Sequence, residues 1–207
     1  MKLDTTLYFI TDSTGVSEEK LLNTVEQACL GGATIIQLRE KDKTTREYID
    51  LAQKVHSVTK KYNVPLIIDD RVDVALAADT EGVHVGQSDM PVSIARKLMG
   101  ENKIVGATTK TVEQAKEAFE QGADYLGVGA IYPTTTKVKT VLTSVDTLKS
   151  IVKAVPINVN AIGGLNTENA DILKGSGISG ICAVSAIMKS ENPKLAAEKL
   201  KEKFYEL

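Results

Sequence analysis

The stretch "CLGGATIIQLREK", residues 29–41, contains a helix end, a buried strand and a polar strand end in that order. Gly31 and Gly32 are typical of the point where a helix stops. The apolar, β-branched run "TIIQL" (34–38) indicates a strand. Charged residues follow it directly, so one short segment combines a structural unit with a possible site.

Similar units recur along the chain. The apolar runs are "LYFI" (7–10), "TIIQL" (34–38), "PLIID" (65–69), "GVHV" (82–85), "KIVGAT" (103–108), "YLGVG" (125–129), "INVNAI" (157–162) and "GICAV" (180–184). Between them, apolar residues recur every three or four positions, which is typical of helices that bury one face. The clearest sets are Leu21, Val25 and Cys29; Leu51, Val55, Val58 and Tyr62; Val112, Ala115 and Phe119; and Ala197, Leu200 and Phe204.

Alternating strands and helices predict parallel strands joined by right-handed crossovers. Repeated units of this kind favour a closed (β/α)₈ TIM barrel that occupies residues 1–207 as a single domain. The usual size of such a barrel is about 250 residues, so little length remains for a second domain. An open doubly wound sheet is the main alternative, but no G-x-G-x-x-G follows the first strand. In a barrel the active site lies at the carboxyl ends of the strands.

Composition limits the class of protein. The chain is 43% hydrophobic and 25% charged, with a net charge of −2, which predicts a soluble protein without the basic surface of a nucleic-acid or membrane binder. The start "MKLDTTLYFITD" lacks a signal-peptide core, and no apolar run reaches the ~20 residues of a membrane span. Cys29 and Cys182 are expected to be buried free thiols, which suits a reducing cytoplasm. The oligomeric state stays open, including a possible homo-oligomer.

Cationic side chains follow the second strand. Gln37, Arg39 and Lys41 alternate with Leu38 and Glu40, so the first three share one face. Helices cover the outside of a barrel, so this face would meet the barrel mouth and form an anion site. A solvated pair of loop charges is the alternative.

Carboxylates follow the next two strands. Asp69 and Asp70 are adjacent, so one could reach the mouth while the other caps the next helix. Asp89 either caps a helix that starts at Pro91 or joins the acids at the mouth. Two carboxylates beside a cationic patch suit Mg²⁺, which binds one or two carboxylates together with substrate phosphates.

The histidines and cysteines offer no conventional catalytic set. His84 lies between Val83 and Val85, so it is expected inside the barrel, as a core histidine rather than a catalytic one. His56 is interpreted as a structural or surface residue of a helix. No Ser/His/Asp or Cys/His pair and no zinc spacing stands out in the sequence.

A second anion site is predicted after the last two strands. Gly163 and Gly164 let the backbone approach a ligand, and Asn166 or Thr167 can start the following helix. Ser185 also begins a helix. Phosphate sites of barrels recur at this place, where backbone N–H groups and a helix N-terminus supply donors. A close-packed turn followed by a helix cap is the alternative.

The segment "YPTTTK" (132–137) follows the sixth strand. No helical pattern appears from Pro133 to Thr143, and Ser144 is expected to cap "VDTLKSIV". This connection exceeds the usual ~2–6 residues and suggests a binding loop or lid. Threonine hydroxyls and Lys137 would suit phosphate oxygens, although a plain connector with a stray lysine is the alternative. Together, these features suit departure of a metal-bound diphosphate beside a second phosphorylated substrate.

An ordered set of motifs extends this interpretation: "YFITD", "QLREK", "IIDDRVDVALA", "GVHVGQSDMP", "GADYLGVGAIYPTTTK", "AIGG" and "AVSAI". From Tyr8 to about Ile187, the chain resembles the thiamine-phosphate synthase family. The resemblance implies a (β/α)₈ transferase of thiamine biosynthesis that needs Mg²⁺. It would condense hydroxymethylpyrimidine diphosphate with a thiazole phosphate, or its carboxylated form, and release diphosphate by dissociative substitution.

The resemblance also implies residue roles. The pyrimidine diphosphate would be bound by Gln37, Leu38, Arg39, Glu40, Lys41, Asp69, Thr108 and Lys137. Among these, the cations Arg39, Lys41 and Lys137 would be catalytic, while Asp70 and Asp89 would hold Mg²⁺. The thiazole phosphate would be bound by Thr134, Thr135, Thr136, Gly164, Val184 and Ser185.

The sequence departs from the family pattern at a few places. Asp69 stands where asparagine is common, and Thr108 stands where serine is usual, so a hydroxyl is retained. The segment after Lys137 lacks the usual glycine. Two rival functions are a thiazole tautomerase, which should not need Asp70, Asp89 and Lys137 together, and a sensor or carrier of a phosphorylated ligand.

Overall fold

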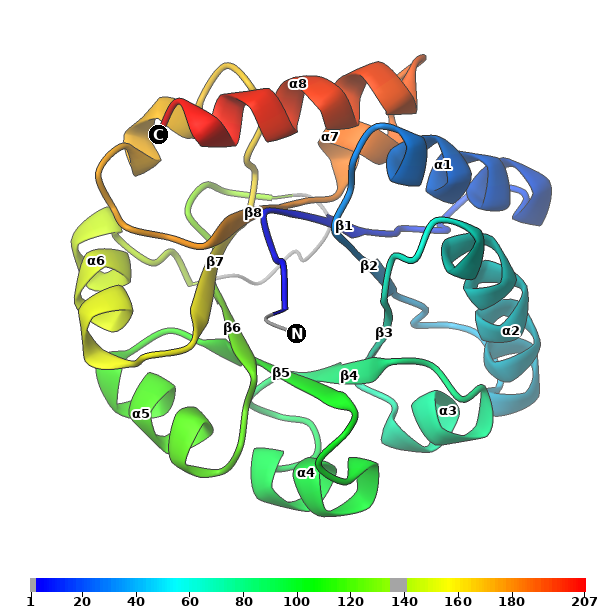
Figure 1. The fold of residues 1–207 in the computed structure, drawn as a ribbon, viewed down its shortest axis with the longest axis horizontal. Helices are drawn as coiled ribbons and strands as arrows, with labels where there is room; N and C mark the ends of the chain where they lie inside the picture. Colours follow the sequence, from blue (N-terminus) through cyan, green and yellow to red (C-terminus); the bar gives the residue numbers. More distant parts are fainter. Residues whose placement is uncertain (1–2, 135–140) are drawn as a thin grey trace.

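The strands form a closed parallel barrel. The computed structural model describes residues 3–134 and 141–207. The strands are β1 (Leu7–Ile10), β2 (Ile35–Leu38), β3 (Leu66–Asp69), β4 (Gly82–Val85), β5 (Ile104–Thr109), β6 (Tyr125–Gly129), β7 (Asn158–Ile162) and β8 (Gly180–Ala183). Each pairs in parallel with the next, and β8 closes on β1, with Tyr8 opposite Cys182 (Figure 1). The predicted fold is confirmed.

Helices surround this barrel (Figure 1). They are α1 (Glu18–Leu30), α2 (Thr45–Lys61), α3 (Val72–Ala77), α4 (Val92–Met99), α5 (Val112–Glu120), α6 (Val145–Ala154), the 3₁₀ turn η1 (Ala170–Leu173), α7 (Ser185–Met188) and α8 (Pro193–Tyr205). None of these helices is long and apolar enough to cross a membrane. The start of α6 was predicted correctly, because the Ser144 hydroxyl accepts a hydrogen bond from the Thr147 N–H at 3.0 Å.

The connection after β7 differs from the prediction of a regular helix at Asn166 or Thr167. The Asn166 carboxamide oxygen accepts hydrogen bonds from the N–H groups of Glu168 and Asn169 at 2.8 and 3.1 Å. These bonds close a tight turn, which continues into η1 instead of an α-helix. The chain after β7 is therefore compact, and the predicted helix was wrong.

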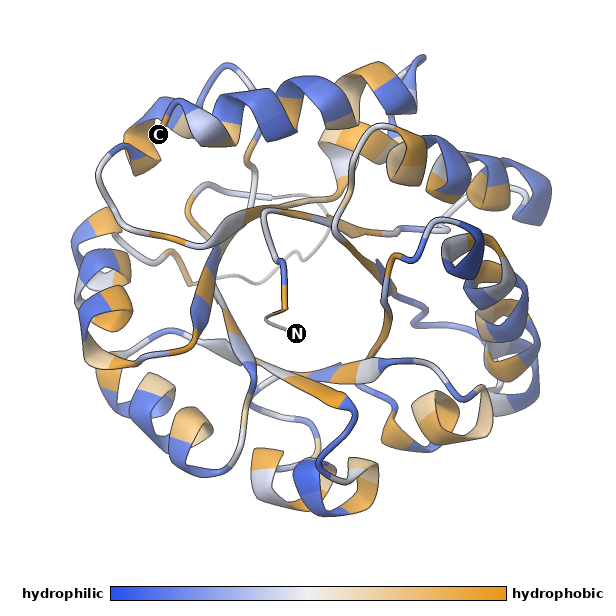
Figure 2. Cartoon of the chain, viewed as in Figure 1, coloured by the Kyte–Doolittle hydropathy of each residue, from blue (hydrophilic) through white to orange (hydrophobic). Residues whose placement is uncertain are grey.

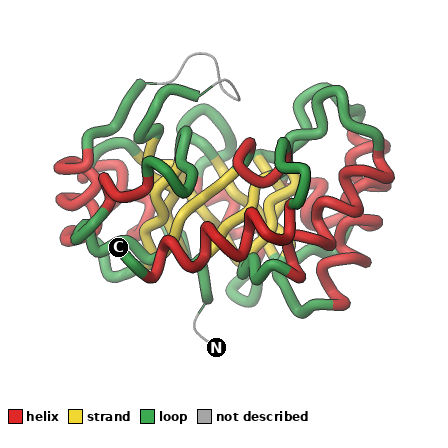
Figure 3. Tube along the Cα trace, turned by 90° about the horizontal axis from the view of Figure 1, so that it is seen from above, coloured by secondary structure: helices red, strands yellow, loops and turns green. Residues whose placement is uncertain are grey.

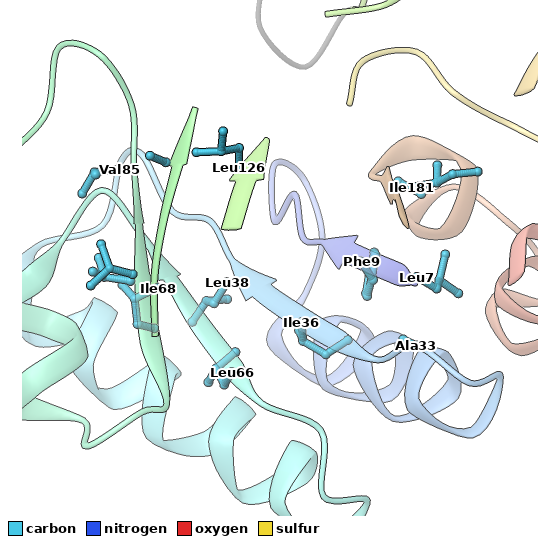
Figure 4. Packing of buried hydrophobic residues seen from close by; sticks show 14 of the residues in the cluster. Leu7, Phe9, Ala33, Ile36, Leu38, Leu66, Ile68, Val85, Leu126 and Ile181 are labelled. Atoms are coloured by element: carbon cyan, nitrogen blue, oxygen red, sulfur yellow. The ribbon is translucent and has the colours of Figure 1, made fainter. Parts of the chain in front are cut away.

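An outer core fills the space between the strands and the helices. It includes Ile36, Leu38, Leu66 and Ile68, all with no exposed surface (Figure 4). Hydrophobic residues of the helices face this layer and hydrophilic residues face outward (Figure 2). The expected inward position of Phe119 was wrong, because 40% of its surface is exposed and small alanines form the buried face of α5.

A smaller inner core fills the barrel itself. Its members are Tyr8, Ile10, Ile35, Ile67, Tyr125 and Cys182. Both cysteines are buried and free, as predicted. Below this layer, the carboxamides of Asn158 and Asn160 donate hydrogen bonds to the carbonyls of Leu3 and Thr5 at 2.8 and 2.6 Å. The N-terminal segment thus closes one end of the barrel, and the strands open toward the other, which we call the mouth (Figure 3).

Candidate active site

The cations after β2 lie at the mouth, as expected. The Lys41 ammonium contacts the Asp69 carboxylate at 2.8 Å, and Arg39 Nε lies 3.8 Å from the same oxygen. The backbone N–H of Arg39 donates to the Thr11 hydroxyl at 3.1 Å, which ties the end of β2 to β1. The Lys41 side chain stays 43% exposed, so a ligand can still reach it.

Asp69 ends β3 and is turned toward these cations. Burial, and then the charge of Asp70, raise the pKa of its carboxyl to about 6, although Lys41 and Arg39 oppose that shift. Only 8% of the surface of Asp69 is exposed, so its carboxylate presents little charge to a ligand at the mouth. Its ion pair with Lys41 offsets part of the cost of burying an acid at the end of β3.

Asp70 and Asp89 face each other from consecutive strand ends. Asp70 has φ 61, a left-handed backbone conformation, and its N–H donates to the His84 carbonyl at 2.8 Å. Asp70 and Asp89 are near enough for each to affect the pKa of the other. Burial, and then Asp70, raise the pKa of Asp89. For Asp70, burial acts upward, but its contact with Lys41 outweighs it and the pKa is lowered.

Neither carboxylate caps a helix. Helix α3 begins after Arg71 and α4 begins after Pro91, and neither position makes a side-chain cap hydrogen bond. Asp89 instead accepts a hydrogen bond from the Gly86 N–H at 2.9 Å. The capping alternatives for Asp70 and Asp89 were therefore wrong, and both side chains remain at the mouth.

This acidic pair fits Mg²⁺. Its donors are carboxylate oxygens, which hard cations prefer, and the nearby charge of Asp70 contributes to the raised pKa of Asp89. Across residues 3–134 and 141–207, no cluster of three or more His, Cys, Asp or Glu side chains forms a complete metal cage. A pair of carboxylates completed by substrate phosphates and water is a usual Mg²⁺ arrangement.

The other residues of the stretch 37–41 point in different directions. Gln37 points into the barrel and donates from Nε2 to the Tyr8 hydroxyl at 2.7 Å. Leu38 points the opposite way into the outer core, so its side chain does not reach the mouth. Glu40 accepts a hydrogen bond from the Ser13 hydroxyl at 2.7 Å and borders a groove of about 590 Å³ beside the mouth.

Thr108 and His84 meet at the top of the barrel interior. His84 Nε2 lies 2.8 Å from the Thr108 hydroxyl, and His84 Nδ1 lies 3.0 Å from the Tyr125 hydroxyl. His84 is 7% exposed, so the prediction of an interior histidine is confirmed. His56 is also buried and contacts Glu81 at 2.9 Å, which confirms its structural interpretation.

The predicted second phosphate site lies across the mouth. Gly163 and Gly164 have φ 108 and 63, and a side chain on Gly164 would come within 2.8 Å of the Pro133 carbonyl. The turn after β7 therefore packs against the segment that leads to Thr134. Val184 and Ser185 start α7, whose first N–H groups have no partner within the helix. Thr135, Thr136 and Lys137 lie outside the described residues.

Three tyrosines around the site were missed in the sequence. The Tyr48 hydroxyl donates to the Leu38 carbonyl at 2.7 Å and joins the ends of β2 and α2. Tyr8 and Tyr125 contact each other inside the barrel at 2.6 Å. The available signal was the two-residue period of strands, which places Tyr8 on the face opposite Leu7 and Phe9.

Comparisons with known proteins agree with this geometry. The sequence profile of the family described as thiamine monophosphate synthase matches residues 7–187. A thiamine-phosphate synthase of Methanobrevibacter smithii is 50% identical over 202 residues, which cover 98% of this chain and 96% of that protein. One of Ruminiclostridium cellulolyticum is 50% identical over 203 residues, covering 98% and 97%.

Solved structures give the same result. Thiamine phosphate pyrophosphorylase from Pyrococcus furiosus has a TM-score of 0.88 and 38% identity, and the match covers 99% of this chain and 98% of that one. A 3-hexulose-6-phosphate synthase has a TM-score of 0.70 at 16% identity, which indicates only a shared fold. The long matches at high identity show that the chain belongs to the thiamine monophosphate synthase family, whose members are transferases of thiamine biosynthesis.

Proposed function

We propose that the protein joins hydroxymethylpyrimidine diphosphate to a thiazole phosphate, or its carboxylated form, and releases diphosphate. One observation carries the proposal: Arg39 and Lys41 lie at the mouth beside the close carboxyl pair of Asp70 and Asp89. Cations alone would suit any phosphate. Cations beside a paired acid suit a diphosphate that arrives with a divalent metal ion.

The chemistry needs a stabilised leaving group more than a nucleophilic side chain. The bond between the pyrimidine methylene carbon and the diphosphate oxygen breaks, and the electron pair leaves with the diphosphate. The thiazole nitrogen then gives its lone pair to that carbon, forming the new C–N bond. With the carboxylated form, the ring carboxyl group would also leave as CO₂, and the ring carbon would take up a proton. Arg39 and Lys41 would stabilise the charge that develops on the departing oxygen, and such preorganised groups act strongly in a partly dry site.

Mg²⁺, held by Asp70 and Asp89, would neutralise part of the diphosphate charge and raise its ability to leave. Lys41 now contacts both Asp69 and Asp70. Asp70 would hold the metal ion, and the Lys41 ammonium would bind the diphosphate. Asp69 would then keep Lys41 at the mouth, because its buried carboxylate remains close by.

The second substrate would lie on the other side of the mouth. Gly164, Val184 and Ser185 present backbone groups there, and the turn packs beside the segment that precedes Thr134. Proximity of two bound substrates would supply much of the rate enhancement, because the trapping step becomes unimolecular. The acids Asp70 and Asp89 weigh against a tautomerase, which would handle one thiazole compound without a diphosphate.

A direct assay tests the proposal. Purified protein is incubated with the pyrimidine diphosphate and each thiazole form, with Mg²⁺ or with a chelator, and thiamine phosphate and diphosphate are quantified. We expect equal amounts of the two products and only in the presence of Mg²⁺. Turnover without a divalent metal would contradict the metal role, and no product with either thiazole form would contradict the function.

A further inference from the structure

A chain of polar side chains crosses the barrel interior and ends at the mouth. It runs from Gln37 through Tyr8, Tyr125 and His84 to Thr108, and we call it the lumen chain. Its successive contacts are 2.7, 2.6, 3.0 and 2.8 Å long. Gln37, Tyr8, Tyr125 and His84 are each at most 7% exposed, so water competes little for these bonds.

Glycines beside the lumen chain leave room for its rings. A side chain on Gly106 would come within 2.1 Å of the Tyr125 ring, so only glycine allows Tyr125 to cross the interior. A Cβ added to Gly127 would lie 3.4 Å from His84 Cε1, which is an ordinary contact distance. The rings of Tyr8 and Tyr125 meet edge to face with centroids 5.6 Å apart. The hydroxyl positions are thus set by the packing of the rings.

Counting protons gives this chain a direction. Either hydroxyl could donate in the contact between Tyr8 and Tyr125. The Tyr8 oxygen already accepts from Gln37 Nε2, and donation to Tyr125 gives the buried Tyr8 proton an acceptor. In the same direction, Tyr125 would donate its proton to His84 Nδ1, 3.0 Å away. Burial raises the pKa of both tyrosines well above the usual value, so each keeps the one proton that this count requires.

A histidine nitrogen that accepts a hydrogen bond carries no proton. In this direction, a neutral His84 ring would carry its proton on Nε2 and donate it to the Thr108 oxygen, which lies 2.8 Å away. Because the Thr108 oxygen accepts from inside the barrel, its own proton remains for an acceptor at the mouth. Gln87 Nε2 also donates to the Thr108 carbonyl at 2.7 Å, which holds the backbone of this residue.

We propose that the lumen chain is a positioning device: it fixes His84 as the Nε2–H tautomer and thereby aims the Thr108 hydroxyl proton out of the barrel toward an anionic ligand. The inference rests on the proposed function only for the identity of that ligand, a phosphate oxygen of the pyrimidine diphosphate. Tyr8, Tyr125 and His84 act through Thr108. If the Gln37 amide were reversed, every bond would reverse and Thr108 would offer the ligand only lone pairs.

The tautomer can be measured without any substrate. The chain has two histidines, so protein labelled with ¹⁵N in the histidine rings gives two sets of signals, and the His56→Gln variant assigns them. We expect His84 to show a protonated Nε2 and an unprotonated Nδ1. In the Tyr125→Phe variant, the Nδ1 signal should move because its donor is lost. A proton on Nδ1 in the unaltered protein would overturn the proposal.

Kinetics tests the link to Thr108. Tyr125→Phe should lower kcat/KM for the pyrimidine diphosphate about tenfold, the size of one well-aligned hydrogen bond. In a Thr108→Val background the same change should have no further effect, whereas Thr108→Ser should keep the effect. Equal losses in all three backgrounds would mean that Tyr125 only supports the fold, and would overturn the proposal.

A second variant covers the case in which Tyr125→Phe does not fold. Tyr8→Phe leaves Tyr125 and His84 in place but removes the donor that directs Tyr125. It should produce a mixture of His84 tautomers and a smaller loss of kcat/KM, again absent from the Thr108→Val background. An unchanged single tautomer in Tyr8→Phe would contradict the directional chain. Absence of product with unaltered protein would refute the proposed function but leave the tautomer result intact.

Discussion

The outer core and the barrel interior are both buried, yet they differ in chemistry. The outer core is aliphatic where β2 and β3 meet the helices, with Ile36 and Leu66 as fully buried examples. The interior contains hydroxyl, imidazole and amide groups joined into one chain that reaches the mouth. Apolar contacts are enough to stabilise a barrel core. Buried polar groups in the barrel interior therefore indicate a functional role at the mouth.

The largest expected effect is a loss of turnover when a charged residue of the mouth is removed. Lys41→Ala should lower kcat by about 10²–10³-fold, as loss of one preorganised charge-stabilising group typically does. Its melting temperature should fall only modestly, because Arg39 Nε remains 3.8 Å from the Asp69 carboxylate that loses Lys41. Lys116→Ala, at an exposed position on α5, is the matched control and should keep full turnover. A collapsed melting temperature in Lys41→Ala would make the lysine structural.

In the outer core, we expect a substitution to lower stability and to leave turnover nearly unchanged. Ile36→Ala should destabilise the protein by about 2–5 kcal/mol, because it removes buried methyl groups and leaves a cavity. Turnover per folded molecule should stay within a few-fold of the original, measured well below the melting temperature. Leu98→Ala on α4 is the control, since 49% of Leu98 is already exposed. A large loss of turnover with unchanged stability in Ile36→Ala would contradict the view that the outer core supports the fold and the mouth supports activity.

A smaller effect is expected from the pH dependence of Asp69 in metal-free protein. Its pKa is about 6 in the fold, mainly because of burial, against about 3.9 in an unfolded chain. Between these values the folded state binds more protons, so ionisation of Asp69 lowers the free energy of unfolding as pH rises. The Asp69→Asn variant cannot ionise at this position, so its free energy of unfolding should not fall for this reason.

Urea unfolding of the two proteins with a chelator, at steps between about pH 4 and 7, measures the difference. The stability of Asp69→Asn relative to the unaltered protein should rise across this window and level off above it. A constant difference would mean that the Asp69 pKa is not raised, and that its ion pair with Lys41 fully offsets its burial.

The smallest effect concerns the thiols of both cores. Burial raises the pKa of the Cys29 thiol to about 12, and it also raises that of Cys182. Neither forms the reactive thiolate near pH 8, so a thiol reagent should modify the native protein very slowly and both residues rapidly after denaturation. Fast reaction of one thiol in the native state would show that its core opens more easily than the structure indicates.

The sequence predicts the barrel well because strands and helices alternate with clear apolar periods. It also places Arg39, Lys41 and Asp89 at strand ends, where the structure finds them. Prediction from the sequence fails where the same residue type can serve either as a helix cap or as a site residue. A carboxylate before a helix looks like a cap, whereas in the folded chain Asp70 adopts a left-handed backbone and pairs with Lys41 instead.

The interior is harder still to predict. Tyr8 and Tyr125 lie far apart in the chain, and their contact depends on the closure of the barrel and on the missing side chain of Gly106. A tyrosine in an apolar run looks like any core aromatic residue. Its polar partner is fixed by the register of distant strands, which local patterns do not contain.

A crystal structure with Mg²⁺ and diphosphate bound tests the central claim most directly. We predict the metal between Asp70 and Asp89, the diphosphate on Arg39 and Lys41, and the Lys41 ammonium moved from Asp70 toward a phosphate oxygen. The Thr108 hydroxyl should lie within hydrogen-bonding distance of the same ligand. A diphosphate bound away from this mouth, or a metal held without either carboxylate, would contradict the account.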